Sequence, residues 1–288
     1  MGALRPARRD RAALPQISPR PLTSDLWLLT PGSPLPTRRC TLPRMFVLKA
    51  HNLTKRYSGR TVVDGVSFDV AEGEIVGLLG RNGAGKTTSF RMAMGMIRPE
   101  AGTIVFNGRD VTKLPVYRRA QRGMGYLAQE PSVFQRLTVE QNLMTILETR
   151  PLGRRQRRVK ADELLGQFGL THVAGQYART LSGGERRKLE IARALVTEPT
   201  LILLDEPFSG VDPVAVEDLQ REIRRLREAG IAILVTDHNV ERTLEICHRA
   251  YVMIDGQVFA QGIPKEIINN QQVRKLYLGS TFKGDEFG

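Results

Sequence analysis

The chain has little cysteine and no long apolar run, the features that mark disulfide-rich, metal-binding and membrane-spanning proteins. Only two of its 288 residues are cysteine, Cys40 and Cys247, which is too few for a disulfide framework and lacks the spacing of a metal site. This scarcity favours a reducing cytoplasm. No apolar run approaches the ~20 residues that cross a bilayer, so we expect any membrane pathway to come from other polypeptides. No nucleic-acid-binding module is visible either, although the formal net charge is +13.

Residues 1–44 differ in composition from the rest of the chain. They hold eight of the sixteen prolines, the only tryptophan (Trp27) and eight arginines against two acids, and they show no apolar periodicity. This composition predicts a disordered Arg/Pro-rich extension. It also resembles an organellar transit peptide, but Met45 is followed at once by a strand pattern. That position favours a mis-assigned upstream start, with the folded domain over residues 45–288.

Residues 80–87, with the sequence GRNGAGKT, match a phosphate-binding loop. An apolar strand over residues 75–79 precedes the loop, and we expect a helix to begin at Lys86. The glycines permit unusual dihedrals, and backbone N–H groups at the helix N-terminus face the phosphates. Lys86 adds a charge that serves catalysis, and the Thr87 hydroxyl is placed to ligate Mg²⁺. The predicted nucleotide-binding residues are Gly80, Arg81, Asn82, Gly83, Ala84, Gly85, Lys86, Thr87 and Thr88.

Two acids, Asp205 and Glu206, end an apolar strand over residues 201–204. Open α/β sheets bind ligands at this end of their strands. We expect Asp205 to hold Mg²⁺, and Glu206 to act as the base that orients or polarises the attacking water. For an isolated pair of acids, solvent exposure at a strand end would be the simpler interpretation, but here the pair follows a phosphate loop.

Two further side chains follow short apolar strands in the same way. His238 comes after the strand of residues 231–236, and Gln129, in the segment of residues 126–130, follows a short apolar strand. The sheet order should bring His238 to the same edge as Glu206, within reach of the γ-phosphate, as a catalytic group. Gln129 is neutral and can ligate Mg²⁺ or water without adding charge. Taken singly, neither residue carries much information.

The sequence LSGGE at residues 181–185 precedes an apolar-periodic helix expected from about Glu185 to Val196. Ser182 and the following glycines would form a second helix N-terminus whose hydroxyl and backbone donors face outward. The chain already has one complete phosphate loop, so this second N-terminus has no phosphate of its own. No internal repeat supplies a partner for it.

The phosphate loop, the LSGGE segment and the strand ending in two acids together resemble the ATPase subunits of ABC transporters. The resemblance implies that the nucleotide is ATP and that two chains pair head to tail as a homodimer. Each LSGGE segment would then close on the ATP held by the partner's loop. The residues that would contact this ATP are Ser182, Gly183, Gly184 and Glu185.

Two more residues gain a role only from this resemblance. Tyr57 lies where the family stacks an aromatic ring on adenine, although an exposed tyrosine in a hairpin is common. Asp212 precedes Pro213 and a helix, so it is a natural N-cap. In the family this aspartate also meets the opposite subunit, and one side chain could serve both purposes.

The order of elements predicts an α/β fold. Antiparallel strands over residues 45–53 and 62–70, joined by one over 102–108, form an N-terminal β subdomain beside a RecA-like parallel core. Residues 131–196 should form a helical subdomain, with helices clearest over 137–147 and 159–168. A tail with two short helices is expected over residues 263–288.

Four segments narrow the resemblance: residues 126–134, 204–213, 236–244 and 273–282. They look like the ATPase subunits of lipopolysaccharide exporters, and the runner-up is the branched-chain amino-acid importer ATPases. The closer resemblance implies a peripheral protein on the cytoplasmic face of a Gram-negative inner membrane, docked to two polytopic subunits of the LptF and LptG type near residues 129–134. The ATPase itself would not contact the lipid.

Two functions of other classes fit less well. A soluble ABC protein acting on ribosomes or DNA would need two fused ATPase units or a long coiled-coil insertion, and neither is present. A module that holds ATP without hydrolysing it is opposed by the intact set of Lys86, Asp205, Glu206 and His238. Phe134 remains open between two interpretations, the first core residue of the helical subdomain or an aromatic anchor for a membrane subunit.

We expect deletion of residues 1–44 to leave folding and ATPase activity intact, because no core-forming pattern lies there. Thermal melting of the truncated and full-length proteins checks this, and a large loss of melting temperature on truncation would refute it.

Overall fold

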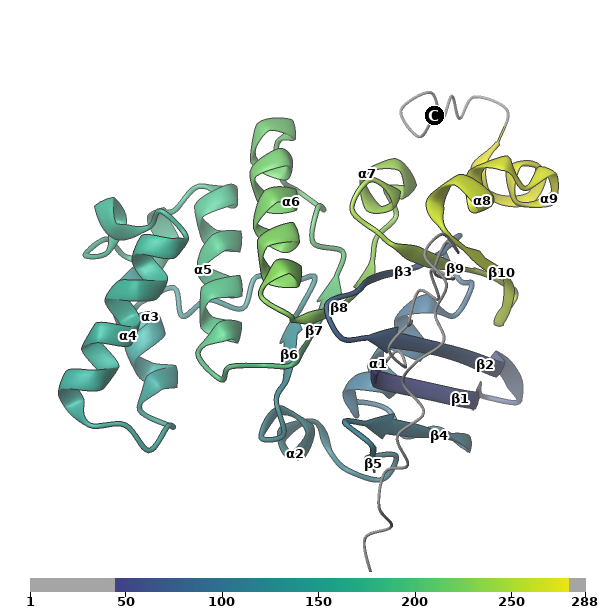
Figure 1. The fold of residues 1–288 in the computed structure, drawn as a ribbon, viewed down its shortest axis with the longest axis horizontal. Coiled ribbons are helices and arrows are strands. Elements are labelled where there is room, and N and C mark those ends of the chain that lie inside the picture. The colour runs from purple at the N-terminus through teal and green to yellow at the C-terminus, as the bar shows by residue number, and fades with distance from the viewer. Residues whose placement is uncertain (1–44, 280–288) are drawn as a thin grey trace, which may run out of the picture. The chain divides into compact units, whose positions relative to one another are not determined.

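The computed structural model describes residues 45–279, so the predictions for residues 1–44 and for the last part of the tail lie outside the described residues. Two sheets form the described part of the chain (Figure 1). Helices α3, α4 and α5 gather at one end of it, and the antiparallel strands β1, β2, β4 and β5 gather at the other (Figure 1). The predicted α/β fold with a parallel core and an antiparallel subdomain is confirmed.

The larger sheet has the strand order β10-β9-β3-β8-β7-β6. All neighbours in it are parallel except β10, which runs antiparallel to β9. Every residue of β3, β7 and β8 is buried, as expected for apolar strands covered on both faces. The strands are β3 (Ile75–Gly80), β6 (Met124–Leu127), β7 (Leu201–Asp205), β8 (Ala232–Thr236), β9 (Arg249–Ile254) and β10 (Gln257–Gly262).

The smaller sheet is antiparallel, in the order β2-β1-β4-β5. Its first strand continues to Tyr57, beyond the predicted end at residue 53, because the pairing with β2 resumes after register shifts around Leu53. The strands are β1 (Phe46–Tyr57), β2 (Arg60–Ala71), β4 (Ala101–Phe106) and β5 (Arg109–Asp110).

Two predicted helix starts were wrong. Helix α3 begins at Val139 because Thr138 caps it and forms a capping box with Gln141. Helix α4 begins at Arg154 rather than at Val159. The prediction missed its first turn because that turn is arginine-rich and lacks the apolar spacing that reveals a helix. The helices are α1 (Lys86–Met94), α2 (Val116–Ala120), α3 (Val139–Leu147), α4 (Arg154–Gln167), α5 (Gly183–Leu195), α6 (Pro213–Glu228), α7 (Val240–Leu244), α8 (Pro264–Asn269) and α9 (Gln271–Val273), and a π-helix, η3 (Arg274–Leu278), follows.

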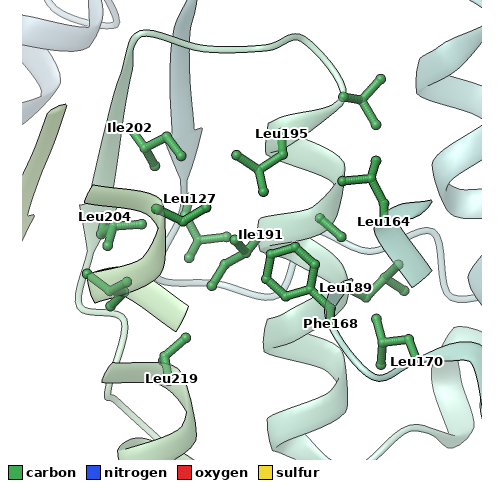
Figure 2. Close-up of a cluster of buried hydrophobic side chains, with 14 of the residues drawn as sticks. Leu127, Leu164, Phe168, Leu170, Leu189, Ile191, Leu195, Ile202, Leu204 and Leu219 are labelled. Atoms are coloured by element: carbon green, nitrogen blue, oxygen red, sulfur yellow. The ribbon is translucent and has the colours of Figure 1, made fainter. Parts of the chain in front are cut away.

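Helix α5 joins the helical region to the parallel sheet through one apolar cluster. Figure 2 shows Ile191 of α5 between Leu127 of β6 and the ring of Phe168, which follows α4. Leu204 of β7 and Leu219 of α6 belong to the same cluster. The start of α5, which carries the LSGGE segment, is therefore positioned by packing against the sheet. Within residues 45–279 no helix has the length and apolar character needed to cross a membrane.

Arg119 is a fully buried charge that holds the far end of α1. Its guanidinium donates hydrogen bonds to the carbonyl oxygens of Met92 and Ala93 at 2.9 and 2.6 Å, and to those of Leu114 and Thr112 at 2.9 and 3.1 Å. Burial lowers the pKa of Arg119 to about 10, against the opposing charge of Asp110. The positive group lies at the negative end of the helix dipole, where it donates to the last carbonyls of α1. The Met92 carbonyl also accepts the Gly95 N–H at 3.0 Å.

We expect Arg119→Met to lower the melting temperature by roughly 5 °C or more, because it removes four hydrogen bonds to carbonyl oxygens around the end of α1. Arg119→Lys is the control: it keeps the charge but offers a compact ammonium instead of the planar fork, so its loss should be smaller. Thermal melting of the three proteins measures the difference. Equal melting temperatures for Arg119→Met and the unmodified chain would contradict this role.

Candidate active site

The phosphate loop runs from the end of β3 to the start of α1, as predicted. Gly80 and Gly85 have φ angles of 149° and 94°. A Cβ on Gly80 would lie 2.4 Å from the carbonyl oxygen of Met253, and one on Gly85 would lie 2.7 Å from that of Val62. Glycine is therefore required at both positions by close approach as well as by dihedral.

The loop lines a hollow together with Val62 and Glu206. Lys86 is buried there, and its Nζ donates to the carbonyl oxygens of Gly80 and Arg81 at 2.5 and 3.1 Å. Burial lowers the pKa of Lys86, while the nearby carboxylates, Glu206 first, act against this shift. The predicted nucleotide-binding residues that line the hollow are Arg81, Asn82, Gly83, Ala84, Gly85, Lys86, Thr87 and Thr88.

Two predicted nucleotide-binding positions lie elsewhere. Gly80 does not line the hollow. Its carbonyl oxygen accepts a hydrogen bond from Lys86 Nζ. Tyr57 is exposed at the end of β1, with the Lys55 ammonium 5.4 Å from its ring centroid, and it is not among the lining residues. The adenine contact of Tyr57 stays a prediction.

Asp205 ends β7 and is almost fully buried. Burial is the main cause that raises its pKa, and the negative charge of Glu206 adds to the effect. Arg91, Tyr126 and Arg187 act against this rise in pKa. A cation bound beside it would favour its ionised form.

Glu206, Gln129 and His238 come together at one edge of the sheet, as the sequence predicted. The Gln129 amide donates from Nε2 to Glu206 Oε2 at 2.9 Å. His238 Nδ1 lies 3.4 Å from the same oxygen. Glu206 itself has a φ of 47°, a left-handed conformation that is uncommon for glutamate, and its backbone N–H donates to the carbonyl of Thr236 at 2.7 Å. The backbone of β8 thus helps to fix the direction of this carboxylate.

Asp237 is a site residue that the sequence analysis did not select. It is fully buried, and its two carboxylate oxygens accept backbone N–H groups of Asn239 at 2.9 Å and Phe208 at 3.1 Å. Burial is the leading cause that raises its pKa. Asp237 Oδ1 also lies 3.4 Å from His238 Nδ1. Asp237 directly follows the buried strand β8, as Glu206 follows β7. This position in the sequence could have identified it as a site residue.

The LSGGE segment forms an exposed helix N-terminus. Ser182 Oγ accepts the backbone N–H of Glu185 at 3.2 Å, and Glu185 Oε2 lies 2.7 Å from that hydroxyl and accepts the Ser182 N–H at 2.9 Å. This capping box confirms the predicted helix, which begins at Gly183. The pKa of Glu185 is lowered, chiefly by the Ser182 hydroxyl. None of Ser182, Gly183, Gly184 and Glu185 lines the hollow of its own phosphate loop.

Asp212 caps α6, as predicted. Its Oδ1 accepts the backbone N–H of Ala215 at 3.0 Å, and Pro213 occupies the first turn. The residue is exposed, so the second carboxylate oxygen faces solvent in this chain.

A buried ion pair missed at the sequence level links α5 to the site. Arg187 Nη1 lies 2.8 Å from Glu190 Oε2 and 2.7 Å from the carbonyl oxygen of Ala128, which precedes Gln129. Glu190 Oε1 accepts the backbone N–H of Ser132 at 2.6 Å. The pair therefore attaches the loop after β6 to the helix that begins with the LSGGE segment. Charges three residues apart on an otherwise apolar helix face were the signal for it.

Phe134 is 41% exposed, which contradicts the interpretation that it is a core residue. Its ring carries the Arg193 guanidinium at 4.5 Å from the centroid. The backbone at Phe134 is fixed by Asn142, whose Oδ1 accepts the Phe134 N–H at 2.8 Å. An exposed aromatic ring on a well-held loop remains available to a partner.

Comparisons with known proteins agree with this geometry. The family described as ABC transporter matches residues 63–209. The lipopolysaccharide export system ATP-binding protein LptB of Haemophilus influenzae is 52% identical over 240 residues, which are 83% of this chain and 100% of that protein. The protein of the same name from Escherichia coli (strain K12) is 50% identical over 240 residues, with the same two coverages.

Solved structures of ATP-binding cassettes from ABC transporters have the same fold. One in its ADP conformation superposes with a TM-score of 0.73 at 28% identity, over 82% of this chain and 99% of that one. A nucleotide-free cassette gives a TM-score of 0.74 at 28% identity, over 82% of this chain and 100% of its own. Fold, site and relatives agree, and the chain belongs to the ABC transporter family as an ATP-binding ATPase subunit.

Proposed function

We propose that this ATPase powers the extraction of lipopolysaccharide from the inner membrane for export to the outer membrane. The observation that carries the proposal is the similarity to two LptB proteins along their whole length. The alternative function, that of a branched-chain amino-acid importer ATPase, is not favoured by these relatives. Affinity purification from membranes tests the proposal by asking which polytopic proteins co-elute.

In the proposed hydrolysis, Glu206 orients and polarises the attacking water. Its carboxylate is held by the Gln129 amide and lies near His238, so its direction is fixed before the nucleotide reacts. Lys86 and the backbone donors of the phosphate loop stabilise the charge on the phosphates. His238 is exposed beside Glu206, and we expect it to contact the γ-phosphate.

The residues of the site fit a magnesium ion. Thr87, Gln129 and Asp205 supply the hydroxyl, amide and carboxylate oxygens that this ion prefers. Gln129 uses its Nε2 for Glu206, which leaves its oxygen free. No group of three or more His, Cys, Asp or Glu side chains able to hold a metal occurs in residues 45–279, so phosphate oxygens would complete the coordination. The ion would neutralise charge on the phosphates.

A head-to-tail homodimer would complete the ATP site. Ser182 and Gly183 are exposed and lie outside the hollow of their own chain, which supports their use by a partner. Their helix N-terminus offers backbone donors and a positive dipole end to a phosphate. Asp212, with one oxygen committed to its own helix, would meet the partner with the other.

The membrane partners would be two polytopic subunits of the LptF and LptG type. We place their docking at residues 129–134, where an exposed aromatic ring lies beside the loop that holds Gln129. The chain would then work as a peripheral protein on the cytoplasmic face of the inner membrane and would not touch the lipid.

Glu206→Gln should reduce turnover by about a hundredfold or more, because the amide keeps the shape but loses the basic carboxylate. ATP binding should persist, and ATP-dependent dimers should accumulate, since their release needs hydrolysis. Steady-state ATPase assays and size-exclusion chromatography with ATP measure both effects.

Lys86→Ala is the contrasting control. It removes a charge from the phosphates, so it should weaken nucleotide binding itself and give no dimers. If Glu206→Gln remains monomeric with ATP bound, the paired-site arrangement is wrong.

Phe134→Ala should weaken assembly with the membrane subunits by roughly 2 kcal/mol or more, as expected for an aromatic anchor at an interface. The ATPase activity and melting temperature of the isolated protein should change little. The Phe134 ring is exposed, and the side chain it contacts is Arg193 rather than a residue of the phosphate loop. Co-purification with the membrane subunits and thermal melting provide the comparison.

Tyr117→Ala is a matched control, since this exposed tyrosine on α2 also carries an arginine, Arg118, over its ring at 5.3 Å. It should leave assembly unchanged. A Phe134→Ala protein that loses activity and melting temperature as far as it loses assembly would rule out a docking role.

A further inference from the structure

The start of α4 concentrates positive charge. It carries four arginines within five residues, Arg154, Arg155, Arg157 and Arg158, and its first turn holds no acid. Cations in the first turn of a helix oppose the helix dipole, and like charges three or four residues apart on one helix repel each other. The arginines therefore do not serve the stability of α4.

Three of these arginines have no ion-pair partner. Arg158 lies 3.8 Å from Glu140 Oε1. Arg154, Arg155 and Arg157 form no ion pair with any residue of the described part of the chain. The first two are exposed, and the Nε of Arg157 is buried without a hydrogen-bond partner among those residues. Three positive charges are thus available to a ligand from outside the chain.

A hollow of about 350 Å³ lies beside these arginines. Two apolar side chains, Leu152 and Val159, line it together with Arg155 and Lys160. Val159 is 51% exposed. Two acids line the hollow as well, and one of them, Glu198, lies 3.2 Å from Lys160 Nζ. Exposed apolar groups among cations are typical of protein surfaces that lie in a membrane interface.

The arginines are connected to the loop at which we place the membrane subunits. Glu140, the partner of Arg158, is in the first turn of α3. Asn142 of the same helix holds the backbone of Phe134 through two hydrogen bonds, at 2.8 and 3.1 Å. Helices α3 and α4 lie side by side (Figure 1). A chain docked through Phe134 would therefore hold the start of α4 close to the membrane.

We propose that the arginines at the start of α4 bind the headgroups of anionic phospholipids at the bilayer surface, as distinct from the transported lipid. The inference rests on the proposed function, which puts the chain at the membrane. Arginine pairs with phosphate groups through two parallel hydrogen bonds, and anionic bilayers attract basic segments. Nucleic acids also carry phosphates, but residues 148–163 contain no aromatic ring on which bases could stack. The lipid surface is the better fit.

Co-sedimentation of the full-length chain with vesicles, without nucleotide, tests the inference. We expect binding to vesicles of phosphatidylglycerol, weakened by salt, and little binding to vesicles of phosphatidylcholine. Replacing Arg154, Arg155 and Arg157 together by glutamine should lower the binding constant roughly fivefold for each arginine, or about a hundredfold in all. The melting temperature should stay the same or rise, because these charges oppose the helix dipole.

Two further variants separate the site from packing and from net charge. Lysine at the same three positions keeps the charge, so most of the vesicle binding should remain. Replacing Arg109, Lys113 and Lys265 by glutamine removes the same formal charge from exposed positions outside α3, α4 and α5, and should change binding much less. All variants keep residues 1–44, so the arginines of that segment contribute to each measurement alike.

Equal losses in the two glutamine variants overturn the inference, since net charge would then explain the binding. Binding to single-stranded RNA but not to vesicles, with the same dependence on the three arginines, overturns it in favour of a nucleic acid. Release from vesicles by inorganic phosphate, at an ionic strength where sodium chloride releases nothing, assigns the arginines to a free anion and overturns it too. Failure of polytopic proteins to co-elute would overturn only the proposed function, because vesicle binding is measured on the isolated chain.

Discussion

The parallel direction of four neighbouring strands is the constraint on which the site depends. Gln129, Glu206 and His238 follow β6, β7 and β8, and the phosphate loop follows β3, which pairs with β8. Because these strands are buried along their length, each polar group appears only where its strand ends. The same burial raises the pKa of Asp205 and lowers the pKa of Lys86, and both shifts favour the neutral form of the side chain. A bound nucleotide and cation would restore the charges that the fold itself disfavours.

Helix α5 connects this edge of the sheet to the rest of the proposed dimer. Its apolar face is packed against β6 and β7 (Figure 2). Its Arg187–Glu190 pair holds the backbone on both sides of Gln129. Movement of the loop that carries Gln129 therefore strains a buried ion pair, which is costly to break. The same pair thus connects the helix that begins with the LSGGE segment to the loop of Gln129. A membrane subunit that pressed on Phe134 would act on the same loop.

The sequence predicted the features that depend on local pattern. The phosphate loop, the buried strands and the Ser182 and Asp212 caps follow from residue types at fixed spacings, and the structure has all of them. What it could not predict depends on contacts across the fold. The burial of Asp237 and its hydrogen bond from the Phe208 N–H depend on residues far away in the chain. Phe134 stayed open because a single aromatic residue in a loop has no periodicity to show which way it faces, and the start of α4 was missed because arginines reveal no apolar side.

The capping box at Ser182 affects how the N-terminus of α5 would bind an anion. A hydroxyl has one hydrogen, and Ser182 shares its own with Glu185, an acid whose charge is stabilised by that contact. Within the described chain, Glu185 is the acceptor of this hydrogen. A phosphate that accepted the Ser182 hydrogen would have to displace this glutamate.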